Sequence, residues 1–278
     1  MDQPPTPFVS AAWLVEHLRD PDLAILDVRW ALPDGADRDA FLASHIPGAR
    51  FVDLDQELAG PPGTAGRHPL PAPQRFTQAM QAAGVSQVGR VVAYDGGSGA
   101  AARAWWLLRA AGHARAMVLD GGLPAWISAG GEVEAGEVAV EPGDFVAASF
   151  RGWVSADQTA EILEAGAVVL DARTRERYHG APSPLDPRPG HIPGARNLPW
   201  SDAYQDRRVV APKDLAGLVR SAAGTKKPAI AYCGSGVTAC SLILALESGG
   251  FEDVLLYPGS WSEWAQDPSR PVDEGNAK

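Results

Sequence analysis

Residues 230–240 read IAYCGSGVTAC and join two elements of different kind around one cysteine. The apolar run Ala229–Tyr232 predicts a short buried strand, and the apolar run Ala239–Leu246 predicts a helix. Cys233 falls between them, and two of the next three residues are glycines. Glycines allow successive backbone N–H groups to converge on one point, and a helix N-terminus adds partial positive charge there. The sequence therefore favours Cys233 as a thiolate nucleophile; the alternative is a buried structural cysteine.

Three motifs occur twice, which indicates a duplicated domain. ILDVR at 25–29 returns as VLDAR at 169–173, HIPGAR at 45–50 returns unchanged at 191–196, and VAYD at 92–95 returns as IAYC at 230–233. The separation stays between 138 and 146 residues for all three motifs. The repeats predict a first domain over residues 1–130, a linker over 131–152 and a second domain over 153–278.

Each copy alternates short apolar strands with helices. Helices are expected to begin at Ser10 and Ser155, since serine is a favourable N-cap residue. This alternation predicts an α/β fold, with a mostly parallel sheet flanked by helices in each domain. Ligands of such sheets bind at the carboxyl ends of the strands, where Cys233 falls. The Pro- and Gly-rich loop 60–73 has no counterpart in the second copy, and so long a loop is usually functional or mobile.

The two copies differ at the position of the expected nucleophile. The first copy carries Asp95 where the second carries Cys233. Because a carboxylate cannot perform thiol chemistry, the first domain is predicted to be catalytically silent. The polar residues that both copies share are interpreted as structural, through ion pairs and turn contacts: Asp27, Arg29 and His45, with their repeats Asp171, Arg173 and His191.

Composition excludes several classes of protein. The chain has 278 residues, a formal net charge of −10 and 45% hydrophobic residues, which argues against a nucleic-acid or anionic-membrane partner. Its two cysteines, Cys233 and Cys240, do not form a disulfide framework, and Cys240 is expected in the core. The sequence shows neither an export signal nor a run long enough to span a membrane. A reducing, cytoplasmic location is expected.

With the duplicated motifs and the cysteine loop together, the chain resembles the two-domain sulfurtransferases of the rhodanese superfamily over essentially its whole length. The loop is similar to that of the members that use 3-mercaptopyruvate. The resemblance implies that Cys233 accepts a sulfane sulfur, becomes a persulfide and passes the sulfur to cyanide or to a thiol, such as thioredoxin or a small thiol. It implies neither a cofactor nor a metal. Backbone N–H groups would cradle the persulfide, contributed by Gly234, Ser235, Gly236, Val237 and Thr238.

The resemblance also implies residues that bind the donor. Arg177 matches an arginine that binds the anionic end of the donor, and a guanidinium suits a two-point contact with an α-keto carboxylate. Arg188 is a plausible substitute for a second arginine, because the segment 182–189 is shorter than the family pattern; a solvated loop arginine is the alternative. Ser235, His68 and Asp55 match a proposed Ser-His-Asp relay, although His68 could also serve only in packing.

Several alternatives remain open at the level of sequence. Thiosulfate is the alternative donor, but the enzymes that use it typically carry basic residues directly after the cysteine, where this chain has Gly234 and Ser235. A persulfide carrier without turnover is a second alternative. A cysteine phosphatase is disfavoured, because the arginine that ends such loops is replaced by Ala239. Two tandem domains already provide an internal interface, so a monomer is expected.

Overall fold

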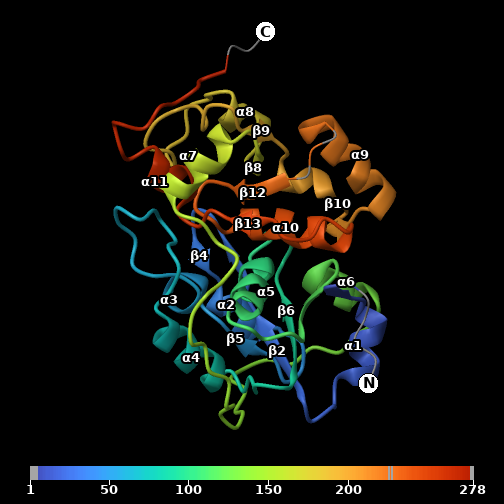
Figure 1. Cartoon of the computed structure of the whole chain (residues 1–278). Helices are drawn as coiled ribbons and strands as arrows, with labels where there is room; N and C mark the ends of the chain where they lie inside the picture. Colours follow the sequence, from blue (N-terminus) through green and yellow to red (C-terminus); the bar gives the residue numbers. More distant parts are fainter. Residues whose placement is uncertain (1–5, 225, 227, 276–278) are drawn as a thin grey trace. The chain divides into compact units, whose positions relative to one another are not determined.

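The computed structural model describes residues 6–224, 226 and 228–275, and these divide into two compact units (Figure 1). The first unit comprises residues 6–60, 70–151 and 206–208. The second comprises residues 61–69, 152–205 and 209–275, apart from the two gaps. Each unit therefore includes a short segment from the other half of the chain. Of these two segments, residues 61–69 belong to the long loop that only the first copy has.

The first unit is built on a parallel sheet with the strand order β1-β7-β6-β2-β5. Its strands are short and mostly apolar: β1 (Phe8–Val9), β2 (Leu23–Asp27), β5 (Arg50–Phe51), β6 (Arg90–Tyr94) and β7 (Ala116–Leu119). A small antiparallel ribbon joins β3 (Trp30–Ala31) to β4 (Gly35–Ala36). The helices are α1 (Ala11–His17), α2 (Arg38–Ala43), α3 (Leu54–Glu57), α4 (Pro73–Ala82), α5 (Ala101–Ala110) and α6 (Gly122–Ser128).

The second unit repeats this plan with a four-stranded parallel sheet in the order β13-β12-β8-β9. Its strands are β8 (Val168–Asp171), β9 (Arg196–Asn197), β12 (Pro228–Tyr232) and β13 (Leu255–Leu256). A hairpin pairs β10 (Tyr204–Gln205) with β11 (Arg208–Val209), after the 3-10 helix η1 (Trp200–Ala203). The α-helices are α7 (Ala156–Glu164), α8 (Arg175–Tyr178), α9 (Pro212–Ala223), α10 (Thr238–Ser248) and α11 (Ser260–Trp264). The predicted α/β class, with a parallel sheet in each half, is confirmed.

Serine starts the first helix of each unit, as the sequence predicts. The Ser10 side chain accepts a hydrogen bond from the N–H of Trp13. Ser155 forms a complete capping box with Gln158, because each side chain bonds to the backbone N–H of the other residue. These caps fix where α1 and α7 begin, so that each helix leads directly into the first long strand of its sheet.

Of the expected linker 131–152, residues 131–151 pack as part of the first unit. Glu134 and His45 exchange two backbone hydrogen bonds of 2.9 Å, and the N–H of Gly143 donates to the carbonyl of Gln81 at 2.8 Å. The Phe145 side chain is fully buried. A few apolar residues within a polar segment thus anchor it to the sheet domain that precedes it.

The Asp-x-Arg pairs and the histidines of the repeated turns are structural. Nη2 of Arg29 lies 2.7 Å from Asp27, and Nη2 of Arg173 lies 2.6 Å from Asp171, with both carboxylates fully buried. Burial alone would lower the pKa of Arg173, but the adjacent Asp171 outweighs this effect and the pKa is raised. His45 and His191 each bond to a backbone carbonyl at 2.8 Å and stack on an aromatic ring. These groups are thus engaged in contacts within their own unit.

Candidate active site

Cys233 lies directly after β12, at the carboxyl end of the sheet in the second unit. Its side chain is 1% exposed, and its Sγ accepts a hydrogen bond from the N–H of Gly236 at 3.1 Å. Gly236 has a φ of +78°, and a Cβ there would lie 2.3 Å from the carbonyl oxygen of Pro258. The turn therefore requires glycine, both for its backbone conformation and for the close approach of a second loop. The helix α10 begins two residues later and buries Cys240 in the core, as predicted.

The first turn of α11 holds the cysteine loop from the other side. The Ser260 hydroxyl accepts a hydrogen bond from the N–H of Cys233 at 3.1 Å. The N–H groups of Trp261 and Ser262 donate to the carbonyls of Cys233 and Gly234, at 3.0 and 2.9 Å. Because these bonds engage the backbone on both sides of the thiol, the loop cannot shift without breaking several of them. The Sγ is thus held in one place before any donor binds.

Arg177 lies over the loop, as the resemblance implies. A Cβ at position 234 would lie 2.9 Å from Nη2 of Arg177, so only glycine leaves room for the guanidinium. Asp186 holds this arginine through two hydrogen bonds, from Nε at 2.8 Å and from Nη2 at 2.5 Å. Asp186 also lies 3.6 Å from Nη1 of Arg173. The carboxylate fixes the orientation of the guanidinium that covers the cysteine loop.

Arg67 occupies a second position over the same glycine, and the sequence analysis did not single it out. The Cβ at position 234 would lie 3.0 Å from its Nη2. Its backbone N–H donates to the Ser262 hydroxyl at 3.0 Å, and its Nη1 donates to the carbonyl of Leu185. Burial lowers the pKa of Arg67, and the neighbouring Arg177 lowers it further, whereas Asp186 and Cys233 act in the opposite direction. The only sequence signal was its place beside His68 in the loop that the second copy lacks.

Ser235 and His68 lie together in the second unit, although they are 167 positions apart in the sequence. The Ser235 Oγ is 2.8 Å from Nδ1 of His68, and both side chains are buried. His68 reaches this unit because it sits in the segment 61–69. Asp55, the third member of the predicted relay, belongs to α3 in the first unit, where its carboxylate accepts a hydrogen bond from the Trp30 indole at 2.9 Å.

The Arg188 guanidinium bonds to backbone carbonyls of the segment after α11. Its Nε donates to the carbonyl of Ala265 at 2.9 Å, and its Nη2 donates to the carbonyls of Asp267 and Arg270 at 2.9 and 3.2 Å. These bonds tie the segment after α11 to the loop before β9. The structure thus commits this guanidinium to the backbone rather than to the cysteine loop.

The corresponding place in the first unit is occupied by Asp95. Its carboxyl oxygens accept hydrogen bonds from the N–H groups of Gly97 at 2.6 Å and Ala101 at 2.9 Å. Burial raises the pKa of Asp95, while the N–H groups of Ala101 and Gly97 oppose that shift. The Asp95 side chain therefore accepts hydrogen bonds from N–H groups of its own loop.

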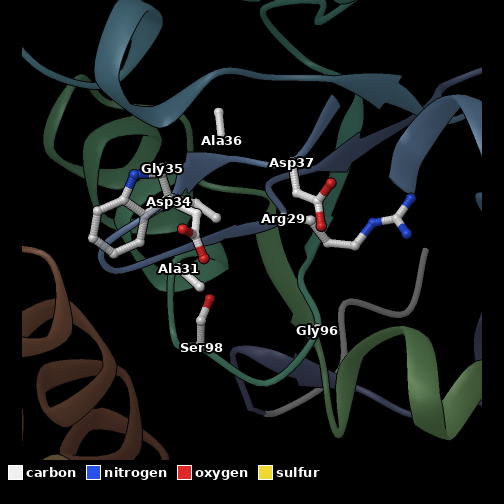
Figure 2. Close-up of a pocket in the computed structure, with 9 residues that line it drawn as sticks. Arg29, Ala31, Asp34, Gly35, Ala36, Asp37, Gly96 and Ser98 are labelled. Atoms are coloured by element: carbon white, nitrogen blue, oxygen red, sulfur yellow. The ribbon is translucent and has the colours of Figure 1, made fainter. Parts of the chain in front are cut away.

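A pocket of about 360 Å³ opens beside this loop in the first unit (Figure 2). Its polar lining includes Arg29, Asp34, Asp37 and Ser98. Figure 2 shows the Ser98 hydroxyl and the Asp34 carboxylate directed toward each other, while the Arg29 guanidinium points away from them. The lining includes no cysteine and no histidine. This pocket offers neither a thiol nor a base of the kind found near Cys233.

The described residues give no sign of a metal or of a membrane segment. Within them, no group of three or more His, Cys, Asp or Glu side chains could hold a metal ion. In the same ranges, each helix is too short or too polar to span a bilayer.

Fold and site together define a class: two parallel α/β domains in tandem, one of which presents a cysteine in a loop of backbone amides. Residues 10–129 and 155–267 both match the rhodanese-like domain. The chain belongs to the rhodanese-like family, which confirms the resemblance drawn from its loop and repeats.

Similar proteins match this chain over almost its full length. It is 42% identical to a probable 3-mercaptopyruvate sulfurtransferase of Pseudomonas aeruginosa, over 96% of this chain and 98% of the relative. It is 40% identical to a putative thiosulfate sulfurtransferase of Mycobacterium tuberculosis H37Rv, over 97% of both. The crystal structure of the 3-mercaptopyruvate sulfurtransferase SseA of Escherichia coli superimposes with a TM-score of 0.82 at 36% identity, covering 93% of this chain and 100% of that one. The relatives' names include both donors, so the choice between donors depends on the site.

Proposed function

We propose that this chain is a sulfurtransferase that moves a sulfane sulfur from 3-mercaptopyruvate to a thiol or to cyanide through a persulfide on Cys233. The observation that carries the choice of donor is the hydrogen-bonded pair of Ser235 and His68, 2.8 Å apart beside the cysteine loop. Release of pyruvate from mercaptopyruvate requires a proton to move, whereas transfer from thiosulfate does not.

In the first half-reaction, the Cys233 thiolate attacks the sulfur of the donor. The new S–S bond forms as the C–S bond of mercaptopyruvate breaks, and its electron pair leaves with the carbon as the enolate of pyruvate. The proton of the donor thiol then reaches that carbon through Ser235 and His68, which gives pyruvate and the persulfide anion. A hydroxyl bonded to an imidazole is suited to such a transfer.

In the second half-reaction, an acceptor thiolate or cyanide attacks the outer sulfur of the persulfide. The S–S bond breaks, its electron pair returns to Sγ of Cys233, and the acceptor leaves as a new persulfide or as thiocyanate. Thioredoxin or a small thiol would fit this role. Both cysteines of the chain are free and buried, which suits a monomer working in a reducing cytoplasm.

Thiosulfate is a second candidate donor, and Arg67 favours it. From sequence, the absence of a basic residue directly after Cys233 argued against a dianionic donor. The structure supplies a cation from a distant segment, since Arg67 and Arg177 both approach the position of a Cβ on Gly234. Arg67 adds a positive charge that no residue directly after Cys233 supplies, so the charge at this site does not exclude a dianionic donor.

Steady-state kinetics with both donors, using cyanide as the acceptor, test the proposal. We expect kcat/KM to be larger for mercaptopyruvate than for thiosulfate. Mercaptopyruvate alone should increase the protein mass by one sulfur atom, and cyanide should remove that mass. A larger kcat/KM for thiosulfate would assign the chain to the second candidate. Loading of one sulfur without repeated turnover would make it a carrier.

A further inference from the structure

Arg67 is held over the cysteine loop at both ends. Its backbone N–H bonds to the Ser262 hydroxyl, and its Nη1 bonds to the Leu185 carbonyl. Its Nε is buried without a hydrogen-bond partner among the described residues. A buried N–H without a partner costs free energy unless a ligand bonds to it. The guanidinium is therefore positioned in advance with one donor unused.

The charges around the loop leave Arg67 unbalanced. Three guanidinium groups lie in this cluster, on Arg67, Arg173 and Arg177, and two carboxylates accompany them. Asp171 pairs with Arg173 at 2.6 Å, and Asp186 pairs with Arg177 at 2.5 Å. Among the described residues, no carboxylate forms an ion pair with Arg67. With the Cys233 thiol protonated, the cluster thus carries one surplus positive charge, which the Cys233 thiolate or an anionic ligand would neutralise.

We propose that Arg67 is the second anion-binding arginine of this enzyme and forms, with Arg177, a clamp for the carboxylate of the sulfur donor. The clamp lies over Gly234, because both Nη2 atoms come within about 3 Å of where a Cβ would stand. Arg67 thereby takes the role that sequence reasoning gave to Arg188. This inference rests on the proposed use of an α-keto acid donor.

The same short segment then supplies two functions to the site. Arg67 binds the carboxylate, and His68 bonds to Ser235 for proton transfer. The segment 61–69 packs in the second unit, although it belongs to the first half of the sequence. A donor without a carboxylate would leave the surplus charge of Arg67 unpaired, so the clamp selects for α-keto acids over neutral ketones.

The test compares wild type with Arg67→Gln, which keeps a hydrogen-bond donor for the Leu185 carbonyl but removes the charge. We expect KM for mercaptopyruvate to rise by about 10- to 100-fold, with a smaller change in kcat, because one charge-assisted contact is lost. Arg67→Lys should recover part of the loss. The exposed Arg75, changed to alanine, is the control and should leave KM unchanged.

A binding measurement separates recognition of the carboxylate from a structural role. Wild type should bind pyruvate more tightly than the uncharged pyruvamide, and Arg67→Gln should lose most of that preference. An unchanged preference and an unchanged KM in Arg67→Gln would overturn the clamp. If wild type does not turn over mercaptopyruvate, the proposed function fails. The titrations of pyruvate and pyruvamide, followed by calorimetry, still decide the role of Arg67 in that case.

Discussion

The loop after β6 and the loop after β12 both follow a strand and lead into a helix, but they carry different side chains at the repeated position. In the first unit, the Asp95 carboxyl accepts hydrogen bonds from the N–H groups of Gly97 and Ala101. In the second unit, Cys233 stands at the repeated position, and its shorter side chain bonds to the N–H of Gly236. The first loop is filled by its own side chain, which engages two N–H groups, whereas the thiol of the second engages one.

The aspartate of the first loop has the same reach from Cβ as a cysteine persulfide would have. A carboxyl oxygen of aspartate stands two bonds beyond Cβ, as does the outer sulfur of a cysteine persulfide. By the repeat of 138 residues, the amides that bind Asp95 correspond to those of Ser235 and Ala239. The first copy therefore indicates which backbone N–H groups the outer sulfur of a Cys233 persulfide would meet.

Replacing the thiol should have the largest effect on this comparison. Cys233→Ser should abolish sulfur transfer, because a hydroxyl cannot carry a sulfane sulfur. Cys233→Asp copies the first loop into the second, and should also be inactive while remaining folded, since its carboxyl would meet amides and two guanidinium groups. Turnover is measured with mercaptopyruvate and cyanide, and folding by thermal melting. Residual turnover above a few per cent in either variant contradicts the role of Cys233.

Removing the hydroxyl–imidazole pair should have the next largest effect. Ser235→Ala and His68→Ala should each reduce kcat with mercaptopyruvate by about 100-fold, within the usual range for general acid–base catalysis. Turnover of thiosulfate, which needs no proton transfer, should fall much less. The ratio of the two kcat values for each variant is the measurement. Equal losses with both donors would mean that the pair only supports the loop.

Arg177→Ala should weaken donor binding by about 1.5–3 kcal/mol, the cost of losing a charge-assisted contact. Arg177 is specific to the second unit, because the first copy has no arginine at the repeated position. Arg188→Ala is the control, since its guanidinium bonds to backbone carbonyls away from the loop. KM for mercaptopyruvate is measured at a temperature at which both variants are folded. An equal rise in KM for the two variants would contradict a specific role of Arg177 in donor binding.

Much of this arrangement could be predicted from the sequence, because it depends on local patterns. The strand, glycines and helix around Cys233 lie within one short segment, and the serine caps need only the residues that follow them. Arg67 was missed because its partners are distant: the Leu185 carbonyl is 118 positions away. Arg188 was matched to a donor-binding arginine by its place in the sequence. Its actual partners are backbone carbonyls, which no pattern of side chains reveals. Sequence patterns indicate which chemistry is present, but not which backbone a long side chain reaches.

The smallest effect concerns the stability of the first loop. Asp95→Ala removes the acceptor of the buried Ala101 N–H and of the part-buried Gly97 N–H, and should lower the free energy of unfolding by about 1–3 kcal/mol. Asp95→Asn keeps one carbonyl oxygen and should cost less. Turnover per folded molecule should not change in either variant, because both cysteines of the chain lie in the second unit. Urea unfolding gives the free energies, and the exposed Asp34, changed to asparagine, is the control.

The pH dependence of the same variants tests how the loop holds a carboxyl. Burial raises the pKa of Asp95 above its value in the unfolded chain. Such a group adds most stability below its unfolded pKa of about 4 and loses that contribution as the pH rises through the folded pKa. The advantage of wild type over Asp95→Asn should therefore shrink as the pH increases. An advantage that grows with pH would mean that the hydrogen bonds from the amides stabilise the ionised carboxylate by more than burial destabilises it. The first loop would then be a true anion site, as the second is proposed to be.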